Sequence, residues 1–232
     1  MTKYLSLFAV VLCLAGCDVR TATGPTEHES HSAKKDTSKT LHTELRMGAG
    51  TLKVNGGASD WMQGDFAFNV PSWKPNIRYT TSGDRGDLTI EQPGNHSSFG
   101  NSTNTWDLRL NNDAPTDLVV RLGAGEATLD LGAMSLRSLQ VEMGAGELRL
   151  DLRGNPKSDY DVHVRGGAGE ATVYVPQNVG VSAKASGGLG EINAQGLRSE
   201  NGHWVNDAYE HAKVQIHLDI QGGVGQINLI AK

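Results

Sequence analysis

The stretch LGAGEATLDL, residues 122–131, places a Gly-X-Gly triplet beside residues that alternate between apolar and polar. Related stretches recur with the same phase: MGAGTLKV from Met47, MGAGELRLDL from Met143, GGAGEATVYV from Gly166, GGLGEINA from Gly187 and GGVGQINL from Gly222. The first glycines of the four central copies are spaced by 21, 23 and 21 residues: Gly123, Gly144, Gly167 and Gly188. Self-similarity of this kind indicates a repeat architecture.

Both arms of each repeat alternate with a period of two. Leu118, Val120 and Leu122 share one face before the glycines, and Leu129 and Leu131 share one face after them. This pattern predicts strands with one buried face. A single repeat is too short to bury that face, whereas units stacked about 4.8 Å apart bury it against their neighbours. Glycine favours a sharp corner between the arms, because it adopts positive φ without strain at Cβ.

We therefore predict an all-β fold, a β-solenoid-like stack of short strands with Gly-X-Gly corners and one β insertion. An antiparallel sandwich is the alternative; the constant phase of the corners and their lack of Asn-Gly hairpin pairs favour the stack. The insertion, residues 55–115, breaks the period and is expected to cap or flank the stack. Two strands are predicted inside it, around 76–79 and 87–90, and a second irregular stretch at 195–212 interrupts the last repeats.

The N-terminal segment predicts export and lipidation. Lys3 precedes an apolar run over residues 4–14, and this run ends in Leu14-Ala15-Gly16-Cys17, which resembles the lipobox of bacterial lipoproteins. We expect residues 1–16 to be a signal peptide and Cys17 to carry the acyl chains, palmitate among them, that hold the protein on a lipid membrane. An ordinary secretory signal with an incidental cysteine is the alternative.

The segment that follows the lipobox differs from the repeats. Residues 17–41 have no apolar periodicity, so we predict a lipidated flexible tether there and a β domain over 42–232. The protein is then expected in the bacterial cell envelope, facing outside the cytoplasm. The sequence leaves open which membrane, inner or outer, holds the anchor.

Composition narrows the classes of partner and cofactor. The net charge of −5 and the pI of about 5.9 give no electrostatic basis for binding nucleic acid. Loss of Cys13 with the signal peptide would leave Cys17 as the one cysteine, so no disulfide or thiolate metal site is expected. We predict no cofactor and no metal site; His28, Glu29 and His31 are interpreted as polar residues of the tether.

The corner motifs resemble a known family. The GAG and GAGE corners, together with the pattern P-x-x-L-x-x-x-L-G-A-G from Pro115 to Gly125, resemble bacterial toast-rack domains, which are related to adhesin-like and LiaF-like cell-envelope domains. The resemblance covers residues 42–232 and implies a stacked β domain in the envelope. LiaF-like proteins carry membrane helices, whereas this chain has the lipobox.

One polar position recurs with the corners. A carboxylate stands three residues after the first glycine in four repeats, Glu126, Glu147, Glu170 and Glu191, and Gln226 stands there in the last. An in-register stack would align these side chains into an acidic stripe that binds a cation or a partner. The alternative is that each carboxylate accepts hydrogen bonds from corner amides or faces water.

Other outward positions are expected to stabilise the stack rather than to take part in catalysis. Arg121, Glu142 and Arg165 are expected to form an ion-pair ladder across successive units. Asp130 and Asp151 occupy equivalent positions, but Tyr174 follows them in the next repeat, so a catalytic column is not sustained. The histidines that follow suit ordinary surface positions: His163, His203, His211 and His217.

The sequence thus predicts a non-enzymatic, adhesin-like structural or interaction module with no catalytic residues, which meets an envelope protein or glycan. An accessory role in cell-envelope stress signalling is one alternative. A carbohydrate-active β-helix enzyme is the other.

Overall fold

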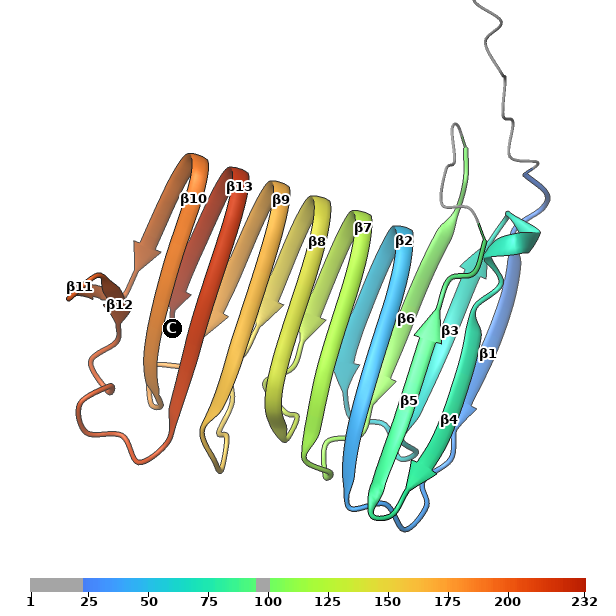
Figure 1. Cartoon of the computed structure of the whole chain (residues 1–232), viewed down its shortest axis with the longest axis horizontal. Helices are drawn as coiled ribbons and strands as arrows, with labels where there is room; N and C mark the ends of the chain where they lie inside the picture. The colour runs from blue at the N-terminus through green and yellow to red at the C-terminus, as the bar shows by residue number, and fades with distance from the viewer. Residues whose placement is uncertain (1–22, 95–100) are drawn as a thin grey trace, which may run out of the picture.

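The structure is a computed structural model that describes residues 23–94 and 101–232, and these form one sheet of 13 strands (Figure 1). Six strands are long and each bends at one Gly-X-Gly triplet, so its two arms lie on opposite sides of a shared core. These strands are β2 (Thr40–Gly56), β7 (Thr116–Asp130), β8 (Leu136–Asp151), β9 (Tyr160–Val175), β10 (Gly180–Gln195) and β13 (Gln215–Ala231).

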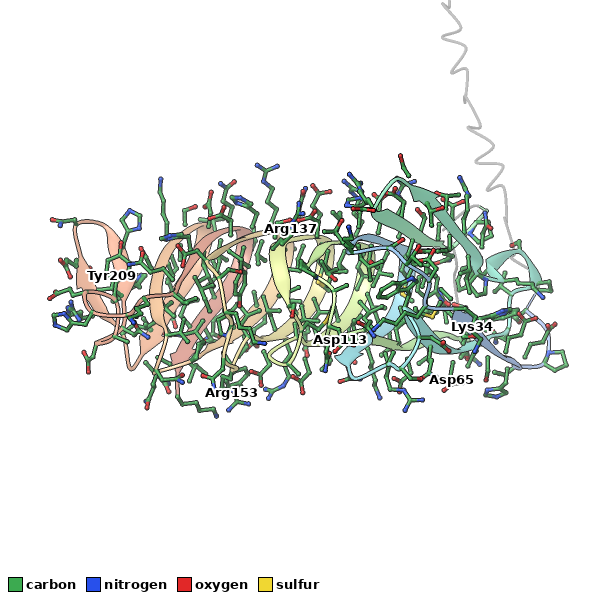
Figure 2. All side chains as sticks on the ribbon, turned by 90° about the horizontal axis from the view of Figure 1, so that it is seen from below. Lys34, Asp65, Asp113, Arg137, Arg153 and Tyr209 are labelled. Carbon is green, nitrogen blue, oxygen red and sulfur yellow. The ribbon has the colours of Figure 1, made fainter. Side chains whose placement is uncertain are left out.

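The long strands pair in parallel and in register, which confirms the predicted stack and not the antiparallel sandwich. Leu129 pairs with Leu150, which pairs with Val173, and all three side chains are fully buried. The corner glycines align in the same way, Gly125 with Gly146. Each predicted pair of arms is one continuous bent strand. The inward side chains of both arms form the core, and the charged side chains project from the two outer faces, Arg137 from one and Arg153 from the other (Figure 2).

The order of the last strands corrects the prediction that successive units stack on one another. The sheet runs β2-β7-β8-β9-β13-β10, so the last strand of the chain lies between β9 and β10. The inward residues of β13 are large, among them Leu218 and Leu229, whereas β10 places Ala183 and Ala194 at equivalent positions. Large apolar side chains gain more from burial between two neighbours than at the end of a stack. The long connection, with β11 (Arg198–Glu200) and β12 (His203–Val205), allows this return.

The insertion closes the other end of the stack, as predicted. The first arm of β2 pairs with β5 (Arg85–Glu91) and its second arm pairs with β6 (Asn104–Leu110). The hairpin partner of β5 is β4 (Asn76–Ser82), and β3 (Met62–Phe68) pairs antiparallel with β6. A single 3-10 turn, η1 (Pro71–Trp73), joins β3 to β4. Buried aromatic side chains fill this end of the core: Trp61, Phe66, Phe68, Trp73 and Trp106.

The structure corrects the predicted tether over residues 27–41. Residues in this range form β1 (Glu27–Ala33), which pairs antiparallel with β3 along its whole length, and the start of β2. The alternation of apolar and polar residues does not indicate this strand, because Ala33 is its one buried residue. The strand is held by backbone hydrogen bonds, which do not depend on the side-chain sequence. Residues 1–22, with the predicted signal peptide and Cys17, lie outside the described residues.

Asp36 fastens the loop between β1 and β2 to the insertion. Its Oδ1 accepts hydrogen bonds from the Ser38 backbone amide at 2.9 Å, the Trp61 indole at 3.1 Å and the Tyr79 hydroxyl at 3.0 Å. These donors, the Ser38 amide first, lower the pKa of the Asp36 carboxyl to about 2. The ionised carboxylate therefore orders a segment that its composition alone assigns to a flexible chain.

Asp36→Asn is expected to lower the melting temperature at pH 7 and to reduce the loss of stability in acid. The folded pKa lies below the unfolded value of about 3.9, so the contribution of the carboxylate is present above pH ~4 and is lost as the pH falls toward 2. Melting curves at pH 7, 4, 3 and 2 measure this, with Asp84→Asn, at an exposed pair with Lys39, as the control. Superimposable pH profiles for Asp36→Asn and the unmodified protein would contradict the assignment.

Candidate functional site at the Gly-X-Gly edge

The bends of the six long strands lie along one edge of the molecule, here called the corner edge (Figure 1). The central residues of the triplets form one row along it, in sheet order Ala49, Ala124, Ala145, Ala168, Val224 and Leu189. The row two residues before the first glycine of each triplet is Arg46, Arg121, Glu142, Arg165, Gln221 and Ser186. The row after them is Thr51, Glu126, Glu147, Glu170, Gln226 and Glu191.

The predicted acidic stripe occupies the third of these rows, with one interruption. Glu126, Glu147 and Glu170 are exposed neighbours in consecutive strands, but Gln226 of β13 stands between Glu170 and Glu191. The Glu170 carboxylate accepts hydrogen bonds from the Asn228 amide at 2.8 Å and the Thr172 hydroxyl at 3.3 Å. The position of β13 in the sheet therefore separates Glu191 from the other three carboxylates, and uncharged side chains donate hydrogen bonds to Glu170.

The predicted ion-pair ladder forms in part. Arg121 Nε donates to Glu142 Oε2 at 3.0 Å, and the same guanidinium also pairs with Glu44 of β2. The Gln140 amide, followed by Arg121, lowers the pKa of the Glu142 carboxyl below its usual value. Arg165 lies next to Glu142 in register and acts on it through charge rather than through a direct hydrogen bond. The ladder is thus a surface feature of the stack.

Asp130 and Asp151 are neighbours in register but lie in different environments. Asp130 is exposed, whereas Asp151 is 9% exposed and accepts hydrogen bonds from the Arg153 backbone amide at 3.0 Å and Arg153 Nε at 2.9 Å. Burial raises the pKa of the Asp151 carboxyl, but the hydrogen bonds and charge of Arg153 outweigh it and leave that pKa lowered. A general acid in glycoside hydrolysis needs a raised pKa, so Asp151 does not match that role.

Tyr174 continues the column of Asp130 and Asp151, and cations surround its ring. The Arg149 guanidinium lies 4.2 Å from the ring centroid, the Arg153 guanidinium 5.1 Å and the Lys232 ammonium 4.7 Å. The Arg149 side chain also donates to the Tyr174 hydroxyl at 2.6 Å. These contacts brace the outer face of the second arms and bring no nucleophile and base together.

The histidines of the second half of the chain lie at the surface. His163, His203, His211 and His217 are all exposed, and His203 Nδ1 lies 3.3 Å from the Ser182 hydroxyl. Near the N-terminus, His31 Nε2 lies 2.8 Å from a Glu29 oxygen. Within residues 23–94 and 101–232, no three histidine, cysteine or acidic side chains converge on one point as metal ligands.

The feature that sequence analysis missed is apolar. Leu189 is 72% exposed and Val224 is 55% exposed, and no other large apolar side chain among the described residues is exposed to that degree. They pair with each other in adjacent strands at the corner edge. The signal was present in the repeats, because the central residue of the triplet changes from Ala to Leu or Val in these two copies.

An apolar hollow of about 80 Å³ lies beneath the same corners. The position before each triplet is filled by Met47, Leu122 and Met143 in the first three long strands, but by glycine in the other three. These glycines are Gly166, Gly187 and Gly222. The hollow is lined between the arms by Ile192, Ile220 and Ile227 among others, so the missing side chains leave an apolar space open at the corner edge.

Comparison with known proteins identifies matching family models and solved structures with a similar fold. The model of the N-terminal domain of toast_rack matches residues 22–174, and the model of the cell wall-active antibiotics response LiaF, C-terminal, matches residues 124–229. The crystal structure of a candidate cell adhesion protein from Clostridium sporogenes is similar to this chain at 36% identity, with 89% of this chain and 100% of that chain covered and a TM-score of 0.87.

A more distant structure, a candidate adhesin from Bacteroides fragilis, is 10% identical, with 91% of this chain and 99% of that chain covered and a TM-score of 0.34. A search of curated proteins found no match. Across the described residues, no helix has the length and apolar character needed to cross a membrane.

Proposed function

This chain belongs to the toast-rack family, and from that membership we propose that it is a lipid-anchored protein of the bacterial cell envelope whose β domain is a non-enzymatic structural or interaction module. The acyl anchor is assigned to Cys17, because Leu14-Ala15-Gly16-Cys17 follows an apolar run of signal-peptide length. The domain then faces outside the cytoplasm. Its partner is an envelope protein or a glycan.

The observation that carries the proposal is the in-register rack of six parallel long strands. Because equivalent residues align in rows, the domain presents extended, regular surfaces at the corner edge and on both outer faces. Repeat proteins commonly use surfaces of this kind for recognition. Arg153 lowers the pKa of the Asp151 carboxyl, which leaves this residue unsuited to the general-acid role that the carbohydrate-active alternative requires.

An accessory role in cell-envelope stress signalling is the second candidate. It is favoured by the match of the LiaF C-terminal model to residues 124–229, which contain the second arm of β7, the whole of β8, β9 and β10, and nearly all of β13. In that case the partner is a membrane sensor of the same cell. The two candidates share the anchor and the rack and differ in the class of partner.

Cross-linking in living bacteria, followed by capture of the full chain from their membranes, tests the proposal. The protein is expected in the membrane fraction with metabolic lipid label, cross-linked to an envelope glycan or adhesion partner; a membrane sensor kinase would favour the second candidate instead. Cys17→Ser should lose the label and the membrane association, because that thiol accepts the lipid.

Cys13→Ser is the matched control and should behave as the unmodified protein, since residue 13 lies in the predicted signal peptide. Equal lipid labelling of Cys17→Ser and the unmodified protein would overturn the anchor. Release of glycan fragments by the purified protein, abolished by Asp151→Asn, would overturn the non-enzymatic assignment.

A further inference from the structure

Leu189 and Val224 make the corner edge apolar over β13 and β10. Single exposed apolar side chains are common on soluble proteins, so exposure alone assigns nothing. These two, however, are paired in register in adjacent strands about 4.8 Å apart, at positions that hold alanine in the other four long strands. The apolar character therefore belongs to one part of the edge.

Fewer charged side chains lie at the corners of β13 and β10 than at the neighbouring corners. Two residues before the triplet, Arg165 of β9 is replaced by Gln221 in β13 and Ser186 in β10. After the triplet, Glu170 of β9 is replaced by Gln226 in β13, so Glu191 of β10 is the one charged residue that β13 and β10 contribute to these two rows. Transfer of a charged side chain toward hydrocarbon is costly, so this replacement lowers the cost of bringing the edge into a lipid surface.

The hollow beneath these corners adds further apolar surface. A Cβ atom placed on Gly166 or Gly187 would meet no atom within 4 Å, whereas Met143 occupies the equivalent space in β8. Apolar atoms therefore continue inward from Leu189 and Val224 between the arms, where a hydrocarbon chain can pack against them.

The described chain begins at the same edge. Glu27 of β1 pairs with Phe68, which pairs with Asn104, and the next residue of β6, Thr105, pairs with Thr51 beside the β2 corner. The Gly24 amide donates to the Asn69 carbonyl at 2.7 Å, which holds the start of the described chain at that level.

This position limits how far the edge can be from the anchor. Seven residues separate Gly24 from Cys17 (24 − 17 = 7), and a chain of that length spans at most about 25 Å. The opposite edge lies a further arm of about seven residues away, roughly 20 Å. A lipid on Cys17 therefore reaches the level of the corner edge without extension of the connection, whereas the opposite edge requires the connection to be almost fully extended.

We propose that the corner edge over β13 and β10 docks on the lipid bilayer that holds the anchor, with Leu189 and Val224 inserted between lipid head groups. This inference rests on the proposed lipidation of Cys17. The short connection holds the β1 end of the corner edge near the membrane plane, the corners of β13 and β10 lie along that same edge, and their uncharged side chains allow contact. Since Glu126, Glu147 and Glu170 line the neighbouring corners, the occupant is a zwitterionic or neutral lipid surface rather than an anionic one.

The test uses the full, processed and lipidated chain in phosphatidylcholine vesicles. Leu189→Cys carries an environment-sensitive dye, and nitroxide lipids report its contact with the bilayer. Ala124→Cys, at the equivalent corner of β7, controls for the dye itself, and Lys157→Cys, in the loop between β8 and β9 at the opposite edge, marks full solvent exposure. Because all three side chains are exposed, the substitutions leave the core intact.

The Leu189 dye is expected to shift to the blue and to be quenched at least about twofold more than the Lys157 dye, with the Ala124 dye between them. Added anionic lipid should not increase the quenching.

Vesicle flotation of the same samples follows the anchor separately. Protein that floats but shows a solvent-like Leu189 dye would overturn the docking alone, whereas protein that does not float would overturn the anchor and the docking that rests on it. A blue shift that requires native membranes and is absent from protein-free vesicles would overturn lipid docking and assign the edge to a protein partner.

Discussion

Leu150→Ala is expected to lower the free energy of unfolding by about 2–5 kcal/mol. Leu150 is 0% exposed and lies in the inward column of the second arms, between Leu129 of β7 and Val173 of β9. Removal of its side chain leaves a cavity that the neighbouring strands cannot close, because their positions are held by parallel backbone pairing on both sides. Urea unfolding followed by circular dichroism measures the loss.

Thr128→Ala is the control for this substitution. Thr128 is exposed on the outer face and pairs with Arg149, so its truncation is expected to change stability by only about 0.5 kcal/mol. Equal sensitivity at Leu150 and Thr128 would be incompatible with a core that lies between the arms.

Gly146→Ala is expected to cost about 2 kcal/mol or more. The φ angle of Gly146 is +125°, in a region that L side chains rarely adopt, and an added Cβ would overlap the carbonyl oxygen of Gly125 in the adjacent strand. The corner thus needs glycine for two reasons, the backbone conformation and the close approach of the next corner. Thermal and urea unfolding both measure this effect.

Gly166→Ala is the matched substitution, at a glycine beside a corner triplet that lacks both constraints. Nothing lies within 4 Å of a Cβ placed there and its φ is outside the restricted region, so stability should stay unchanged or rise by up to about 1 kcal/mol. If both glycines respond alike, the loss at Gly146 reflects strand propensity and not the corner.

Several features were predictable from the sequence because they depend on local backbone geometry. Side chains alternate across a strand, so the spacing of the apolar residues Leu129, Leu150 and Val173 is enough to identify one inward column. The constant phase of Gly125 and Gly146 predicts a corner that requires positive φ. The spacing of Glu126, Glu147 and Glu170 likewise predicts their alignment, since stacked units of similar length repeat their outward positions.

Other features depend on contacts between distant segments and could not be predicted in this way. The place of β13 between β9 and β10 follows from the burial of large side chains such as Leu218 between two neighbours, and it alone separates Glu191 from the other carboxylates. The apolar part of the corner edge exists because that order sets Val224 beside Leu189.

The structure of the N-terminal segment also depends on contacts with distant parts of the chain. Residues 27–33 are polar and without period, yet they form β1 because the exposed edge of β3 offers backbone partners to any extended chain. Asp36 then orders the following loop through donors from Ser38, Trp61 and Tyr79, of which two lie far along the chain. By itself the sequence determined the strands and corners of the repeats, since both are encoded by neighbouring residues, and it predicts the lipobox in the same way. Only the tertiary structure decided the strand order, the extent of the domain and the composition of the corner edge, because these depend on backbone pairing and burial between segments that share no local signature.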